Sequence, residues 1–479
     1  MFRGLVFALA LAGAGFTTGA AAADAPKGSL VIIGGGLRAE NAAVWDKIVA
    51  LAGGQGARIA VFPTAAENPV REGDMAVRNL NRHGAQAFVV PVAPRLAGAD
   101  ARKAAEDPAL AKAVRDAGGA FFTGGDQARI TGALRRVDGG NSAVLDALWS
   151  MYRRGGVIAG TSAGAAIMSS TMFHDPPPDV IPVLKHGVVE GKDIAPGLGF
   201  IGDDVFIDQH LLARGRFARM LPAMLSKGYT LGLGIDEDTA AVVAPTREVT
   251  VIGRTGAIVL DLKGATTDKS RAQFNLSNAR ISYLDNGDRF HLVQGTYVPG
   301  PGKEPVDKTR LEHREALFYP DILGNTAVLD LLVKLVDSDV PRALGLAFDG
   351  PASRAPERGF EFSFSRTPDS GEYVTNREDA YSIYRIRMDV RPVRMAQPLY
   401  TAEWRQRVRA RSPRSCCRRS GRTGAGAAQT TSHRRARNTP PPSPAGRAAC
   451  SAALPSTHTC AAPTGGGGCS PGRLPAPGS

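Results

Sequence analysis

The sequence predicts an α/β fold in which a doubly wound, mostly parallel sheet carries the chemistry at its strand ends. Short apolar runs are each ended by Gly or Pro, helix-compatible segments separate these runs, and chemically active residue types follow directly after them. Strands buried on both faces that alternate with helices imply right-handed βαβ units. Active sites in such sheets lie where the strands end, so the turns after the strands are where functional residues are expected.

The first part of the chain repeats this alternation. Continuous apolar runs, including the Gly or Pro that ends each, predict buried strands at 30–34, 58–63, 86–91, 120–124 and 156–160. The segments between them predict helices at 40–51, 70–82, 108–117 and 142–153. After about residue 245 the pattern changes, and residues 248–262 predict two strands around a Gly-containing turn.

Domain boundaries follow from changes in composition. Residues 24–295 are predicted to form the catalytic domain, and 296–307 a linker rich in Pro and Gly. Residues 308–404 combine an apolar helix at 326–336 with alternating segments at 360–365 and 381–388, which predicts a small α+β or β-rich accessory module. No catalytic constellation occurs in this module, and its role stays open.

Residues 1–23 have the pattern of a cleaved secretory signal. Arg3 precedes a short apolar stretch, and Ala21-Ala22-Ala23 ends in front of Asp24. The stretch is short for a bilayer span, although an uncleaved anchor is the alternative. We expect a secreted protein, extracellular or periplasmic, without membrane association after cleavage.

The positive charge is confined to the C-terminal tail. The chain has 58 Lys+Arg, 45 Asp+Glu and a net charge of +13, but residues 405–479 hold 13 Arg and no Lys, Asp or Glu. The neutral body therefore predicts no nucleic-acid partner. All five cysteines also lie in the tail, which excludes disulfides and thiolate chemistry in the body. The composition of the tail has two explanations: the tail is a disordered arm, or it results from translation of a GC-rich gene out of frame.

The sharpest chemical motif is Gly160-Thr-Ser162-Ala-Gly164, directly after a predicted strand. A Gly-x-Ser-x-Gly turn between strand and helix exposes the serine hydroxyl above the sheet. The following helix offers the N–H of Ala163 to a developing oxyanion. Ser162 is therefore the candidate nucleophile, and a purely structural glycine turn is the alternative.

A serine nucleophile needs a base and an acid that orients the base. Among the six histidines of the body, His210 ends an apolar strand beside Asp208 and Gln209, which favours a base over a packed core histidine. Residues 236–238 then offer three consecutive carboxylates after another apolar strand. Their spacing does not choose among them, and two of the three are expected to be solvated or helix-capping.

Two glycine turns complete the candidate site. In Gly124-Gly125-Asp126-Gln127, the Gly125 N–H can complete an oxyanion hole and Gln127 can donate to a substrate, while a plain turn capped by Asp126 is the alternative. The run 34–36 is a weak dinucleotide signal that we interpret as a tight turn. We expect no cofactor, and no cluster with metal-ligand spacing is visible, so no metal is expected.

Four motifs, in this order, resemble the cyanophycinases. They are Gly124-Gly-Asp-Gln, Gly160-Thr-Ser-Ala-Gly-Ala, Asp208-Gln-His with Arg214, Arg216 and Arg219, and Gly234-Ile-Asp-Glu-x-Thr-Ala. The resemblance covers about residues 28–295. Cyanophycinases are flavodoxin-like serine exopeptidases, related to aspartyl dipeptidases and class I glutamine amidotransferases. They cleave cyanophycin, a polyaspartate with Arg on each β-carboxyl, into β-Asp-Arg dipeptides.

The resemblance implies a role for each motif residue. Ser162 would be the nucleophile, His210 the general base and Glu237 the orienting acid. The residues that would shape the substrate pocket are Gln127, Asp208, Gln209, Arg214, Arg216 and Arg219. An acidic residue suits the guanidinium of cyanophycin, and arginines suit its carboxylates.

The implied partner is the cyanophycin polymer, and a homodimer is compatible with the resemblance. A secreted aspartyl dipeptidase of the same fold is the nearest alternative function. A polymer-binding protein with a degenerate catalytic site is a further one.

Overall fold

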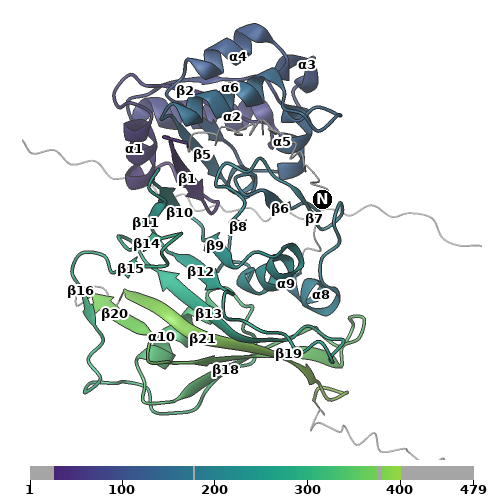
Figure 1. Cartoon of the computed structure of the whole chain (residues 1–479), viewed down its shortest axis with the longest axis vertical. Coiled ribbons are helices and arrows are strands. Elements are labelled where there is room, and N and C mark those ends of the chain that lie inside the picture. Colours follow the sequence, from purple (N-terminus) through teal and green to yellow (C-terminus); the bar gives the residue numbers. More distant parts are fainter. Residues whose placement is uncertain (1–25, 176–178, 376–379, 401–479) are drawn as a thin grey trace, which may run out of the picture. The chain divides into compact units, whose positions relative to one another are not determined.

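The computed structural model describes residues 26–175, 179–375 and 380–400. The predicted signal segment at 1–23 and the predicted tail at 405–479 lie outside these residues. Most described strands belong to two large sheets, which Figure 1 shows with their helices. The predicted α/β class with a mostly parallel sheet is confirmed.

The first sheet has nine strands in the order β15-β14-β11-β10-β1-β5-β4-β2-β3. Its parallel part matches the five predicted apolar runs, and consists of β1 (Ser29–Ile33), β2 (Arg58–Phe62), β3 (Gln86–Val89), β4 (Gly119–Phe122) and β5 (Val157–Thr161). The antiparallel part adds β10 (Thr239–Val243), β11 (Glu248–Gly253), β14 (Arg289–His291) and β15 (Tyr297–Val298). The carboxyl ends of the parallel strands therefore share one edge.

Helices cover both faces of this sheet because successive strand residues point to opposite sides. In β1, Leu30 and Ile32 belong to one apolar core and Val31 and Ile33 to another. One core is closed by α1 (Ala42–Leu51) and α2 (Pro69–Arg82), and the other by α3 (Ala101–Ala105), α4 (Pro108–Arg115), α5 (Gln127–Leu134), α6 (Ala143–Arg153) and α7 (Ala163–Ala166).

The longer of these helices begin at side-chain caps. Asn41, Asn68, Asp107 and Ser142 each accept a hydrogen bond from a backbone N–H in the first turn of the helix that follows. Such caps satisfy N–H groups that have no partner within the helix. The caps explain why the helices begin where the sequence predicts.

The second sheet combines strands from both sides of the predicted linker. Its order is β17-β18-β19-β21-β13-β12-β9-β8, with β20 and β16 attached beside β21. The strands are β8 (Val205–Gln209), β9 (Leu231–Ile235), β12 (Ala257–Asp261), β13 (Leu276–Leu284), β16 (Lys303–Pro305), β17 (Leu317–Tyr319), β18 (Arg342–Phe348), β19 (Arg358–Ser365), β20 (Gly371–Thr375) and β21 (Tyr381–Arg394). Over the residues that the structure describes, the predicted accessory module thus adds strands to a sheet of the predicted catalytic domain and forms no separate sheet.

The strands predicted within 248–262 and the linker predicted at 296–307 both contribute to the sheets in ways that the sequence did not indicate. The two strands predicted within 248–262 exist, but β11 pairs in the first sheet and β12 in the second. The predicted linker contains β15, which pairs with β14, and β16, which pairs with β20. It therefore contributes to both sheets.

The second sheet packs against α8 (Val180–His186), α9 (Phe217–Lys227) and α10 (Ala327–Val336). The helix α10 matches the apolar helix predicted at 326–336. A further pair of strands, β6 (Thr171–Phe173) and β7 (Ile194–Pro196), forms a small antiparallel sheet. Across the three described ranges, no helix combines the length and the apolarity that crossing a bilayer requires.

Candidate active site

The Gly-x-Ser-x-Gly segment forms a tight turn between β5 and α7. Ser162 has φ +55°, and its backbone N–H donates to the Ile33 carbonyl at 3.0 Å. A Cβ at Gly160 would lie 2.4 Å from the Gly164 carbonyl oxygen, and a Cβ at Gly164 would lie 2.6 Å from that of Phe122. Both glycines are therefore required by close backbone packing, and the turn presents the Ser162 side chain at the strand end.

His210 follows β8 and faces Ser162. Its Nε2 lies 2.8 Å from the Ser162 Oγ, and its backbone N–H donates to the Gly34 carbonyl at 2.7 Å. A Cβ at Gly35 would lie 2.2 Å from the imidazole Cε1. The run 34–36 is thus a tight turn that leaves room for the imidazole ring.

The structure distinguishes the three carboxylates after β9 by their partners. The Glu237 Oε1 lies 2.6 Å from the His210 Nδ1. Asp236 instead accepts from the backbone N–H groups of Leu212 and Ala213, both at 3.1 Å. Asp238 accepts from the Arg38 N–H and from the Asn41 amide. Asp236 and Asp238 are both buried, so neither is solvated. Neither caps a helix, the other alternative, because their partners are not N–H groups in the first turn of a helix.

Electrostatics around His210 favour its neutral form. Burial, the largest effect, lowers the pKa of His210 below its ordinary value. The hydrogen bond that His210 donates to Glu237 acts in the opposite direction and raises this pKa, while the charges of Arg214 and Arg216 lower it. A neutral imidazole can accept a proton from the serine hydroxyl at neutral pH.

Of the two residues predicted to form an oxyanion hole, Ala163 directly follows the serine, and Gly125 follows Gly124, which lies beside the serine. Ala163 is the first residue of α7, where backbone N–H groups have no partner within the helix. Gly125 has φ +138°, and a Cβ there would lie 2.1 Å from the Ala65 carbonyl oxygen. A Cβ at the preceding Gly124 would lie 3.3 Å from the Ser162 Cβ. Asp126 also caps α5, as the plain-turn alternative expected.

Two of the predicted substrate-binding residues, Asp208 and Arg219, pair with each other. The Asp208 carboxylate accepts hydrogen bonds from both Nε and Nη2 of Arg219, each at 2.7 Å, and the two residues are only 1% and 3% exposed. The Arg219 guanidinium also lies over the Phe173 ring at 4.1 Å. Asp208 is thus already paired and is not free for a substrate guanidinium, because a buried charge needs its partner.

The four other predicted substrate-binding residues lie outside the pocket beside Ser162. Arg216 donates to the backbone and side-chain oxygens of Gln209, both at 3.0 Å, and burial lowers its pKa to about 10. The Gln127 amide donates to the Phe173 carbonyl at 2.8 Å. Arg214 is exposed. None of the six predicted substrate-binding residues lines the pocket beside Ser162.

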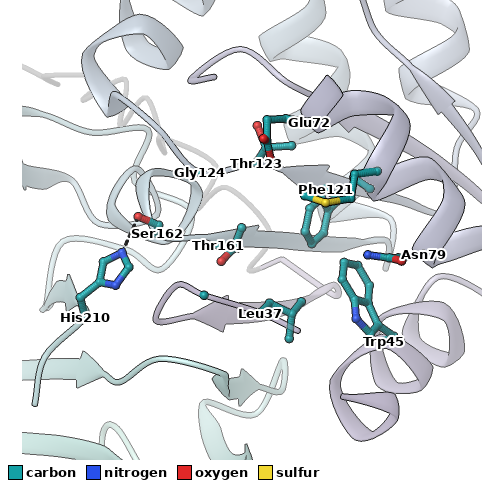
Figure 2. A pocket seen from close by; sticks show the side chains of 13 residues that line it. Leu37, Trp45, Glu72, Asn79, Phe121, Thr123, Gly124, Thr161, Ser162 and His210 are labelled. Atoms are coloured by element: carbon teal, nitrogen blue, oxygen red, sulfur yellow. Dashed lines mark hydrogen bonds between the residues drawn. The ribbon is translucent and has the colours of Figure 1, made fainter. Parts of the chain in front are cut away.

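That pocket has a volume of about 280 Å³, with Ser162 and His210 at one end (Figure 2). Its other walls come largely from the segment after β1 and from α1, α2 and β4; they include Leu37, Trp45, Glu72, Met75, Asn79 and Phe121. These residues do not stand out in the sequence, where both helices are indicated only as cover for the sheet. The burial of the polar Asn79 on α2 becomes visible only in the structure.

One group of potential metal ligands exists within the described ranges. Ligand atoms of Glu312, His313 and Asp337 lie within 4.8 Å of one another. No ligand spacing in the sequence indicates this cluster, because Asp337 is distant in sequence from the other two. These residues do not line the pocket beside Ser162.

Comparison with known proteins places the chain in a family. The model of peptidase family S51 matches residues 30–251. A cyanophycinase of Trichormus variabilis is 30% identical over 283 residues, covering 58% of this chain and 89% of the relative. A cyanophycinase of Geminocystis herdmanii is 32% identical over 284 residues, covering 58% of this chain and 97% of the relative. A crystal structure of a peptidase from an acI-B1 Actinobacterium is 22% identical, with a TM-score of 0.41, and covers 56% of this chain and 98% of that chain. The chain belongs to peptidase family S51 and is a serine-type peptidase.

Proposed function

We propose that this peptidase is a cyanophycinase, an exopeptidase that releases β-Asp-Arg dipeptides from cyanophycin. The observation that carries the reaction type is the hydrogen-bonded chain from the Ser162 Oγ through His210 to Glu237, with distances of 2.8 and 2.6 Å. The substrate is supported by two relatives named cyanophycinase, matched over 89% and 97% of their length.

In the proposed first step, the Ser162 Oγ attacks an aspartyl carbonyl of the polymer backbone. The His210 Nε2 takes the hydroxyl proton, and Glu237 stabilises the imidazolium through Nδ1–H. The N–H groups of Ala163 and Gly125 would stabilise the oxyanion. When the peptide C–N bond breaks, His210 returns its proton to the leaving amine, and an acyl-enzyme remains on Ser162.

In the second step, water attacks the acyl-enzyme. His210 takes one proton from the water, the new C–O bond forms, and the ester bond to Ser162 breaks as the serine oxygen regains a proton. The products are a carboxylate and free enzyme. Each turnover consumes one water and requires no external oxidant or reductant.

The test is the product that forms from insoluble cyanophycin. We expect clearing of the polymer with release of β-Asp-Arg, and loss of this activity by several orders of magnitude in Ser162→Ala, because triad members act as a unit. Ser150→Ala, a serine on α6 outside the pocket, is the matched control and should keep full activity. Cleavage of α-Asp dipeptides without attack on cyanophycin would instead identify an aspartyl dipeptidase.

We also propose that the enzyme is secreted, on the basis of the predicted signal at 1–23. Expression in a secreting host, followed by N-terminal sequencing of protein outside the cytoplasm, should give a mature chain that begins at Asp24. Retention of the intact N-terminus on protein inside the cytoplasm would contradict this proposal.

A further inference from the structure

The pocket beside Ser162 has an uneven charge. Among its lining residues there is one carboxylate, that of Glu72 on α2, and there is no Lys or Arg. His210 is the other ionisable lining residue, and burial lowers its pKa, which favours the neutral ring. Glu72 therefore carries the one formal charge among the lining residues when His210 is neutral, and it lies on α2, away from His210 (Figure 2).

The Glu72 carboxylate is only partly engaged by the protein. Its Oε1 accepts from Nε and Nη2 of Arg71 at 3.0 and 2.7 Å, while within the described ranges its Oε2 accepts no hydrogen bond. The Arg71 side chain is 73% exposed and that of Glu72 is 26% exposed. Exposed ion pairs contribute about 0–1 kcal/mol, so a cationic ligand can compete with Arg71 for this carboxylate.

Asn79 places a second acceptor in the same pocket. It lies seven residues after Glu72 and therefore on the same face of α2. The residue is only 7% exposed, and it lines the pocket. Its side-chain oxygen can accept a hydrogen bond from a ligand that carries N–H donors.

Aromatic rings form the adjoining wall. The ring centroids of Trp45 and Phe121 are 5.4 Å apart, and both residues line the pocket. The Trp45 Nε1 donates to the Arg38 carbonyl at 2.9 Å, which fixes the orientation of the indole. Both residues are only 2% exposed, and Trp45 also stacks with His83, so the rings supply an electron-rich wall that attracts a cation and not an open face for stacking. One carboxylate, one amide oxygen and this aromatic wall together suit a guanidinium.

We propose that Glu72, Asn79 and the rings of Trp45 and Phe121 form a subsite for an arginine side chain of the substrate. This inference rests on the proposed function, in which every repeat of the polymer carries an arginine. Glu72 then supplies the guanidinium contact that the sequence analysis expected from Asp208, whose carboxylate is held by Arg219. The volume of about 280 Å³ suits one side chain better than several repeats. In this role Glu72 determines specificity and takes no part in the chemistry at Ser162.

The first test compares two variants that each remove one negative charge from α2. Glu72→Gln should lower kcat/KM for cyanophycin by about 10- to 100-fold, mainly through KM, because a charge-assisted hydrogen bond is lost. Asp74→Asn is the control, since Asp74 is exposed on the same helix and does not line the pocket. It should stay within about twofold of the wild type, the range of ordinary surface substitutions. Thermal unfolding of both variants checks that the fold is intact.

The second test does not depend on cyanophycin cleavage. A serine-directed fluorophosphonate labels the protein in the presence of saturating butylguanidine or of its neutral isostere butylurea. We expect butylguanidine to slow labelling of the wild type and of Asp74→Asn, but not of Glu72→Gln, and butylurea to slow none of them. Equal effects of the two ligands, or full protection in Glu72→Gln, would overturn the subsite.

The two tests separate this inference from the proposed function. If cyanophycin is cleaved and Glu72→Gln behaves as Asp74→Asn does, the subsite is wrong and the proposed function stands. If cyanophycin is not cleaved but butylguanidine protects through Glu72, the guanidinium subsite stands and the proposed polymer substrate is wrong.

Discussion

Substitution of Gly35 by alanine tests whether the position of the His210 ring controls the reactivity of Ser162. Gly35 has φ +118°, and a Cβ there would lie 2.2 Å from Cε1 and 2.5 Å from Nε2 of the imidazole. Ordinary contact between carbon atoms is about 3.5–4.0 Å, so the ring must retreat by more than about 1 Å. That movement would break the 2.8 Å contact between Nε2 and the Ser162 Oγ.

The expected magnitude follows from this displacement. Misplacement of a catalytic group by about 1 Å costs about 10²-fold in rate. We therefore expect Gly35→Ala to react with a serine-directed fluorophosphonate at least about 10²-fold more slowly than the wild type. Labelling is the preferred assay because it reports the nucleophile directly and needs no knowledge of the substrate.

Gly53→Ala provides a matched control. Gly53 has φ +117°, nearly the value at Gly35, but the nearest atom to its added Cβ would be 3.9 Å away. Both variants carry similar backbone strain, about 1–3 kcal/mol, and only Gly35→Ala disturbs the base. Thermal unfolding should show that both proteins remain folded, with Gly35→Ala the more destabilised because its clash with the imidazole adds to the backbone strain. Equal labelling rates for both variants, or a near-normal rate for Gly35→Ala, would refute this reasoning.

Three further predictions concern charge. The labelling rate should fall at acid pH with a midpoint below 6.5, because burial lowers the pKa of His210 from that ordinary value; a midpoint above 6.5 would be inconsistent with a buried base. Glu237→Gln should move this midpoint to still lower pH, since it removes the negative charge that raises the pKa and strengthens the hydrogen bond from His210, whereas Arg214→Gln should move it upward by removing a repulsive charge. Shifts of the same sign would contradict the assigned geometry. Arg219→Met should lower the free energy of unfolding in urea by about 3–5 kcal/mol, because Asp208 is left buried and unpaired; a change below about 1 kcal/mol would show that the pair is solvated.

The sequence predicted the parallel strands and their helices well because those signals are local. An apolar run such as 30–34 must be buried on both faces, and caps such as Ser142 mark where helices begin. Sheet membership depends on pairing between distant residues, which local patterns do not encode. For that reason β12 and β21, which lie in one sheet, appeared to belong to different domains.

For the candidate site, too, the sequence predicted what local motifs encode and missed what depends on packing. Ser162 and His210 stand in motifs at strand ends, so their proximity could be anticipated from a sheet with aligned carboxyl ends. The pairing of Asp208 with Arg219 could not, because the sequence does not show that both side chains are buried together. Glu72 was missed for a related reason, since only the packing of α2 places one of its acidic residues in the pocket.

The central claim is that Ser162 is a nucleophile activated by His210, and covalent labelling tests it most directly. Fluorophosphonate treatment followed by peptide mass spectrometry should find one adduct per chain, on Ser162. The adduct should be absent from Ser162→Ala and should form several orders of magnitude more slowly in His210→Ala. An adduct on another residue, or labelling that persists unchanged in Ser162→Ala, would contradict the account.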